Sequence, residues 1–241
     1  MNIKEYQYVS EVYAHLMKSI DYEGWAYYIL EIAENNNLRA DSALELGSGN
    51  CSLASFLKDK FQFFAALDLS LSMLKKSGEP DLVRVCGDMK NLPFKKKFDL
   101  IFSAFDSVNY LLSRDELLQF FKSVKSVLSE DGILTFDVSL ERNSLKHVKR
   151  LNRKGKVEKI KYIQKSSYSK KEKIHSNHFK IKLKDGKIVE ELHRQRIYPL
   201  ETYFDLAEEA GLTVKNCYEA FTFDQAEPKS ERAQFIVQQS L

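Results

Sequence analysis

The chain has 241 residues, of which 44% are hydrophobic and 29% are charged, and its formal net charge is +3. This balance is typical of a globular protein and excludes extensive disorder, and the length allows one α/β domain with an appendage. So small a net charge does not by itself indicate a particular partner.

The cysteines and the apolar runs bear on the compartment. Cys51, Cys86 and Cys217 are scattered and form no CxxC pair, which argues against a disulfide framework and against a metal site. No apolar run approaches the roughly 20 residues of a membrane span. The opening stretch MNIKEYQYVS also lacks the basic-then-apolar layout of a signal peptide. We therefore expect a cytoplasmic protein with no membrane partner.

The first forty residues are predicted to be helical. Tyr6, Val9, Tyr13 and Leu16 recur at helical spacing, and EGWAYYILEIAENN continues with a second apolar face. After Asp41 the pattern changes to the short apolar runs SALEL, FFAALD, LVRVC, DLIFSA and GILTFDV, separated by helical stretches. Continuous apolar runs of this length are typical of strands buried on both faces. The alternation predicts an α/β fold with a doubly wound parallel sheet.

Helix boundary signals support this order. Ser113 and Glu116 form a capping box at the start of one helix, and an Asp131-Gly132 pair is expected to end it. Near the end of the chain, PLETYFDLAEEAG predicts a helix with Gly211 at its C-terminal cap. The stretches LTVKNCYEAFTF and RAQFIVQQ then predict two closing strands.

The composition changes abruptly near Leu145. Residues 145–187 contain 16 Lys and Arg and 3 Asp and Glu, a local net charge of +13. Within this segment, apolar and basic residues alternate on both sides of an Asp-Gly pair, which is a strong hairpin signal. We expect an antiparallel extension inserted after the fifth parallel strand.

A glycine pair follows the first predicted strand in LELGSGNCSL. Gly47 and Gly49 allow the backbone to turn tightly and a ligand to approach closely. In a doubly wound sheet, ligands bind beyond the carboxyl ends of the strands. Asp68 ends the second strand, roughly 20 residues on, where a carboxylate can accept both hydroxyls of a ribose. By itself, the glycine pair is equally compatible with an ordinary turn between strand and helix.

Three further residues separate the candidate cofactors. Ser52 replaces the third glycine of a GxGxxG motif, so the close packing beside a pyrophosphate is not provided. Asp88 ends the third strand, where it can accept from an adenine amino group. Glu45 would repel a pyrophosphate and attract an ammonium group. Although each acid could be a solvated strand end, together they favour S-adenosylmethionine over a nicotinamide dinucleotide.

The motifs resemble those of a known family. ALELGSGN, LDLSLSML and CGDMKNLPF are similar to the first three motifs of class I S-adenosylmethionine-dependent methyltransferases, and FDLIFSAFDSVNYLL resembles the end of their fourth strand. YQYVSEVYAHLMKSIDYEGW resembles the N-terminal lid of a bacterial subgroup, the YqeM-like proteins, with Ala14 where that subgroup usually has Asp. The resemblance implies a Rossmann-like sheet of seven strands, the last antiparallel. It also implies a lid (1–40), a core (41–144 and 198–241) and a β insertion (145–197).

The resemblance implies a set of cofactor contacts. The residues that would bind S-adenosylmethionine are Tyr6, Tyr13, Trp25, Glu45, Gly47, Gly49, Asp68, Met73, Asp88, Met89 and Phe105. The glycines and Glu45 would hold the methionine portion, Asp68 the ribose, and the two methionines and Asp88 the adenine. Phe105 would lie under the methionine and ribose. The lid aromatics suit a sulfonium by cation–π attraction, although aromatics at helical spacing also fit a core.

Methyl transfer needs a base only where the acceptor carries a proton at the working pH. Asp106, in AFDSVN, is the first candidate for a catalytic base, with an Asx cap of the next turn as the alternative. His193 is the second. If Asp185 and Gly186 form a two-residue turn, His178 faces His193 across the hairpin, and we expect a solvated contact between them.

The basic insertion leaves the acceptor open. It could gather an anionic acceptor, such as RNA or a phosphorylated metabolite. Against nucleic acid, SAFD occupies the place of an NPPY-like motif, and no Pro-Cys pair exists for attack on cytosine. Lysines that alternate with apolar residues also fit an exposed strand. We therefore predict a methyltransferase that acts on a small-molecule acceptor. The alternatives are an RNA or protein methyltransferase and an inactive, cofactor-binding partner subunit.

Overall fold

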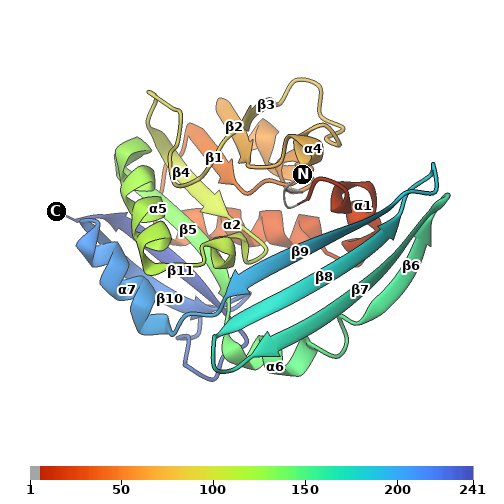
Figure 1. Cartoon of the computed structure of the whole chain (residues 1–241). Helices are drawn as coiled ribbons and strands as arrows, with labels where there is room; N and C mark the ends of the chain where they lie inside the picture. Colours follow the sequence, from red (N-terminus) through yellow and green to blue (C-terminus); the bar gives the residue numbers. More distant parts are fainter. Residues whose placement is uncertain (1–5, 241) are drawn as a thin grey trace.

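The structure, a computed structural model, describes residues 6–240 and is built around a seven-stranded mixed sheet (Figure 1). Its strand order is β10-β11-β5-β4-β1-β2-β3. The strands are Ser42–Leu46 (β1), Phe63–Asp68 (β2), Val83–Cys86 (β3), Phe98–Ser103 (β4), Leu128–Ser139 (β5), Leu212–Glu219 (β10) and Arg232–Gln239 (β11). Strands β1 to β5 pair in parallel, and β11 is antiparallel to both its neighbours. The predicted Rossmann-like sheet with an antiparallel last strand is confirmed.

Helices cover both faces of this sheet. They are Val9–Glu11 (η1), Tyr13–Leu16 (α1), Tyr22–Asn35 (α2), Ala54–Leu57 (α3), Lys58–Lys60 (η2), Leu71–Leu74 (α4), Ser107–Tyr110 (η3), Arg114–Val127 (α5), Glu141–His147 (α6) and Leu200–Glu209 (α7). One apolar core lies between the sheet and α5 and α7, and a second lies between the sheet and α2 and α3. Within residues 6–240, no helix combines the length and the apolar character needed to cross a membrane.

The boundaries of α5 show where local signals succeed and where they fail. The capping box is present, because Ser113 accepts from the Glu116 backbone N–H and the Glu116 carboxylate accepts from the Ser113 N–H. The helix ends before the Asp131-Gly132 pair, however, and this pair lies inside β5. The pairing of β5 with β4 jumps from Leu128 to Ile133, so the turn residues form an irregularity within the strand.

The basic insertion forms a second sheet, of four antiparallel strands in the order β6-β7-β8-β9. The strands are Arg153–Val157 (β6), Ile160–Ser169 (β7), Ile174–Lys182 (β8) and Ile188–Arg196 (β9). Figure 1 shows this sheet beside the main sheet, with α1 next to it. Its buried face packs against the N-terminal segment through the apolar side chains of Val9, Val12, Leu16, Ile160, Tyr162, Phe179, Ile181 and Val189. Its lysines alternate with these residues and point to the other face.

The expected pairing of the two histidines is wrong by one residue. Leu183 N–H donates to the Lys187 carbonyl, so the loop of the hairpin holds three residues, not two. His193 therefore faces Asn177, and His178 faces Leu192. Because a shift of one residue in a strand exchanges its faces, His178 lies on the exposed face, whereas His193 is 2% exposed.

Candidate active site

A cavity of about 280 Å³ lies at the carboxyl edge of the main sheet, under the N-terminal segment. Of the residues predicted to bind a cofactor, all except Trp25 line it: Tyr6, Tyr13, Glu45, Gly47, Gly49, Asp68, Met73, Asp88, Met89 and Phe105. They come from the ends of β1, β2, β3 and β4, from helix α4 and from the N-terminal segment. Trp25 does not line the cavity but packs against Phe105, which does, with a distance of 4.8 Å between the two ring centroids.

The glycine loop forms a backbone wall of the cavity. Gly47 and Gly49 have φ angles of +69° and +57°. A Cβ at Gly47 would lie 2.8 Å from the Ser107 side chain, and a Cβ at Gly49 would lie 3.2 Å from Met73 Cε. Asp68 braces this loop, because its carboxylate accepts from the N–H groups of Gly49 and Ser70, both at 2.7 Å. The left-handed backbone and the lack of space both require glycine here.

Glu45 brings an uncompensated acid to the cavity. Its side chain is 2% exposed, and its Oε2 has no hydrogen-bond partner within the described residues. Desolvation, followed by the nearby Asp68 carboxylate, raises the pKa of Glu45 well above its ordinary value. Desolvation also raises the pKa of Asp68. A ligand ammonium beside these two carboxylates would relieve both effects.

The substitution Glu45→Gln is expected to stabilise the ligand-free protein by about 1 kcal/mol at pH 8. Because the folded pKa is raised, the folded protein retains a proton that the unfolded chain releases above pH 4.5. This group therefore costs stability as the pH rises from there toward the folded pKa, and the gain should vanish near pH 4.5. Urea unfolding at the two pH values measures it. An equal gain at both would contradict the assignment.

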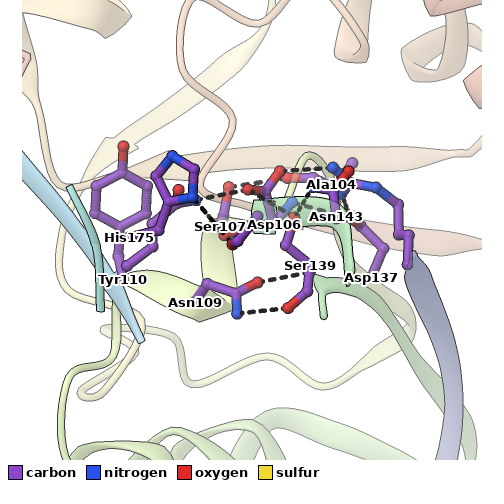
Figure 2. A network of polar contacts seen from close by, with 12 residues as sticks. Ala104, Asp106, Ser107, Asn109, Tyr110, Asp137, Ser139, Asn143 and His175 are labelled. Atoms are coloured by element: carbon purple, nitrogen blue, oxygen red, sulfur yellow. Dashed lines mark hydrogen bonds and ion pairs between the residues drawn. The ribbon is translucent and has the colours of Figure 1, made fainter. Parts of the chain in front are cut away.

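Asp106 lies outside the cavity lining, in a buried polar network (Figure 2). Its backbone is left-handed, with φ +51°, as is that of Phe105 before it. Its carboxylate accepts from Gln195 Nε2 at 2.7 Å and from Arg232 Nη2 at 3.0 Å. Arg232 also donates to Asp137, which is fully buried. A carboxylate that already serves two donors is poorly placed to take a proton from a ligand.

Asn109, which follows in the same loop, fixes the network to β5. Its side-chain amide donates to the Ser139 carbonyl at 3.2 Å and accepts from the Ser139 N–H at 2.9 Å, as the dashed lines in Figure 2 show. It also donates to the Arg196 carbonyl at 2.7 Å and is completely buried. Asn109 therefore holds the loop after β4 against the insertion and does not face a ligand.

His193 reaches the cavity through two tyrosines that line it. Its Nε2 lies 3.1 Å from Glu191 Oε2, and its Nδ1 lies 3.2 Å from Tyr110 Oη. Tyr110 Oη lies in turn 2.7 Å from Tyr6 Oη. The other oxygen of Glu191 accepts from the N–H groups of Tyr8 and Val9. His193 is therefore buried beside Glu191, and the solvated contact with His178 that the sequence suggested does not form.

Sequence reasoning missed part of the lining. Tyr22, Lys90, Ser107 and Glu116 also line the cavity. Ser107 and Lys90 lie within a few residues of predicted strand ends, a signal that could have found them. Tyr22 lies in the lid-like stretch YQYVSEVYAHLMKSIDYEGW, which could also have indicated it. Nothing local to the sequence places Glu116 at this edge, because its helix, α5, approaches from elsewhere.

Comparisons with known proteins agree with this geometry. Residues 43–132 match the family model of a methyltransferase domain. The chain is 27% identical to the protein YqeM of Bacillus subtilis (strain 168), over 98% of this chain and 97% of that protein. It is 30% identical to a dTDP-3-amino-3,4,6-trideoxy-alpha-D-glucopyranose N,N-dimethyltransferase of Streptomyces venezuelae, over 43% of this chain and 44% of that enzyme.

A solved structure extends the agreement to the whole chain. The crystal structure of an S-adenosylmethionine-dependent methyltransferase from Clostridium acetobutylicum ATCC 824 superposes with a TM-score of 0.81 at 26% identity, over 99% of this chain and 100% of that one. The match therefore includes the N-terminal segment and the four-stranded sheet as well as the core. With its sheet order and its methyltransferase domain, the chain is an S-adenosylmethionine-dependent methyltransferase.

Proposed function

We propose that the lining residues bind S-adenosylmethionine in the cavity at the carboxyl edge of the sheet. Two observations support the fit. Gly47 and Gly49 line the cavity without side chains, so a ligand can approach their backbone closely. Glu45 offers a ligand ammonium a buried oxygen that has no partner within residues 6–240. Asp68 can still accept from ribose hydroxyls, because a carboxylate has about four acceptor sites and its two backbone bonds use two.

The remaining predicted contacts complete this pocket. Met73, Met89 and Asp88 would surround the adenine, and Phe105 would lie against the methionine and ribose. Tyr6 and Tyr13 would close over the ligand as part of the lid, whereas Trp25 supports Phe105 from behind. When bound, S-adenosylmethionine supplies an electrophilic methyl group. The protein must align the acceptor with it and exclude water.

The acceptor that this cavity favours is a small amine. The observation that carries this proposal is the charge of the lining: Glu45, Asp68, Asp88 and Glu116 line the cavity, against one basic residue, Lys90. Among residues 6–240, none of the basic side chains of the insertion lines it, so the lining gives no support to an anionic acceptor. A negative cavity attracts cations and repels anions. The acceptor named for the Streptomyces relative carries an amino group of this kind, and its anionic dTDP portion would have to lie outside this lining.

A matched panel of acceptors tests this function. The purified protein is incubated with S-adenosylmethionine and either the dTDP-3-amino sugar named above or its 3-hydroxy analogue, simple primary amines, thiols and total RNA. We expect S-adenosylhomocysteine to form with one or more amines, with a mass gain of one or two methyl groups on the amine. Turnover of RNA or protein alone would instead establish docking through the basic insertion.

The same panel distinguishes an active enzyme from the alternative, an inactive subunit that binds the cofactor. A protein that binds S-adenosylhomocysteine in calorimetry but methylates no member of the panel would be a cofactor-binding partner subunit. We retain the cytoplasm as the proposed compartment, and the three cysteines, all unpaired, agree with reducing conditions.

A further inference from the structure

We infer that Tyr6, Tyr110, His193 and Glu191 form a proton relay that takes a proton from the acceptor during methyl transfer. This inference rests on the proposed function, since a relay is needed only for an acceptor that carries a proton, such as an ammonium group. It assigns a function to a buried His-Glu pair that lies outside the lining and is joined to it through two hydroxyls.

The hydrogen bonds define the direction of the relay. An ionised Glu191 can only accept, so the His193 nitrogen that faces it, Nε2, carries a hydrogen. In neutral imidazole the other nitrogen, Nδ1, is then an acceptor and takes the Tyr110 hydroxyl hydrogen. Tyr110 oxygen can accept in turn from the Tyr6 hydroxyl at 2.7 Å. Tyr6, a wall of the cavity, is the end of the relay that can receive a proton from a ligand.

The surroundings of the pair favour a proton sink at His193. Glu191 and His193 are 3% and 2% exposed. The backbone N–H groups of Tyr8 and Val9 donate to one oxygen of Glu191, and His193 Nε2 lies beside the other oxygen. An imidazolium formed beside this carboxylate would be neutralised by it in a medium that excludes water. The rings of Tyr6 and Phe179 also pack on His193, with centroids 4.4 Å and 5.1 Å from that of the imidazole, and the Phe179 ring carries no charge.

The tyrosines pass the proton without losing their own. Burial raises the pKa of Tyr6 well above its ordinary value, and Tyr110, Asp106 and Asp68 raise it further. Tyr6 is therefore a neutral phenol at any working pH and cannot act as a tyrosinate base. The transfer must be concerted: Tyr6 accepts one proton as it gives another to Tyr110.

The atoms and charges balance. An ammonium acceptor loses one N–H proton to Tyr6 Oη, Tyr6 gives its own proton to Tyr110 Oη, and Tyr110 gives its own to His193 Nδ1. The freed nitrogen lone pair forms the bond to the methyl carbon as the carbon–sulfur bond breaks, and its electron pair stays on sulfur. One positive charge is then on His193 and the other on the methylated nitrogen. His193 returns its proton to solvent when the cavity opens.

The tautomer of His193 tests the relay without any turnover. Nitrogen-15 histidine NMR of the complex with S-adenosylhomocysteine, with the signal assigned by comparison with His193→Gln, reports which ring nitrogens carry hydrogen. We expect hydrogen on Nε2 alone at pH 8, and a change in the Nδ1 shift in Tyr110→Phe. Hydrogen on Nδ1, or a permanent imidazolium, would overturn the relay, because the receiving nitrogen would already be occupied.

The pH dependence of catalysis provides the second test, with whichever amine is methylated. His193→Gln keeps polar groups at this place but cannot take a proton, so kcat/KM at pH 7 should fall at least 100-fold, within the range typical of a lost base. The loss should shrink as the pH rises, because the free amine replaces its ammonium form. A variant that was only misfolded would not recover in this way.

The insertion offers a matched control. His178 Nε2 lies 3.1 Å from Glu190 Oε2, the same separation as in the buried pair, but this contact joins β8 to β9 on the exposed face of the sheet. His178→Gln should retain wild-type kcat/KM at all pH values. Affinity for S-adenosylhomocysteine should stay within twofold in His193→Gln and His178→Gln, whose side chains lie outside the cavity lining, which separates failure of the relay from failure of the cofactor site. A wild-type pH profile in His193→Gln would also overturn the relay.

Discussion

Replacement of Arg232 by glutamine is expected to lower the free energy of unfolding by about 3–5 kcal/mol at pH 7.5. The Arg232 guanidinium donates to Asp106 and to Asp137, and the Asp137 side chain is fully buried. The two carboxylates would remain close together without a counter-charge, since Asp106 N–H itself donates to Asp137 Oδ2 at 3.0 Å. A buried pair that loses its cation costs far more than an exposed one. Urea unfolding with and without the substitution measures the loss.

The loss should depend on pH in a defined direction. Burial and, to a smaller extent, the Asp106 carboxylate raise the pKa of Asp137 to about 6 against the opposing effect of Arg232. The folded protein thus holds this proton more tightly than the unfolded chain, and stability through this group falls as the pH rises from about 4 to 6. In Arg232→Gln the pKa of Asp137 should be higher than in the wild-type protein, because the cation that lowers it is gone. The loss of unfolding free energy should therefore be largest above pH 7 and smaller at pH 5, where Asp137 is protonated.

An exposed ion pair serves as the control for this prediction. Arg114 lies 4.0 Å from Asp205, with both side chains more than half exposed. Arg114→Gln should change the free energy of unfolding by less than about 0.5 kcal/mol at any pH. A loss below about 1 kcal/mol in Arg232→Gln would show that the network tolerates two unpaired carboxylates. A larger loss that does not change with pH would show that it does not arise from the charge of Asp137.

The second large effect is expected for Asp68→Ala, which should weaken the binding of S-adenosylhomocysteine at least tenfold. The substitution removes the acceptor proposed for the ribose and also the brace on the glycine loop, whose two backbone N–H groups would lose their partner. Isothermal titration calorimetry measures the affinity. Asp59→Ala, at an exposed residue beside Lys58, is the control and should bind normally.

A ligand without ribose hydroxyls separates the two effects of Asp68. The 2′,3′-dideoxy analogue of S-adenosylhomocysteine should bind the wild-type protein at least tenfold more weakly than the parent compound. Asp68→Ala should discriminate between the two by less than twofold, because the interacting group is already gone. If the two losses simply added, Asp68 would act only as a brace and the ribose would lie elsewhere.

Local patterns in the sequence determined the main sheet and the edge at which we propose that the cofactor binds. SALEL and FFAALD coincide with β1 and β2 because strands buried on both faces must be apolar throughout. The glycine pair could be recognised from the sequence because the condition that requires glycine is local: a left-handed backbone with little room for a Cβ. The capping box of α5 was legible for the same reason, since its partners lie three residues apart.

Contacts between distant segments were decided only by the tertiary structure. Asp106 has a carboxylate that could act as a base, but this carboxylate pairs with Arg232, 126 residues away, which no local pattern could reveal. The hairpin loop has three residues instead of the expected two, which shifts the β8–β9 register by one residue and places His193 on the buried face, not on the solvent-exposed face. Glu191 became significant only because the N-terminal segment packs on it. A side chain's residue type and spacing fix what it can do, and its long-range packing fixes which groups it meets.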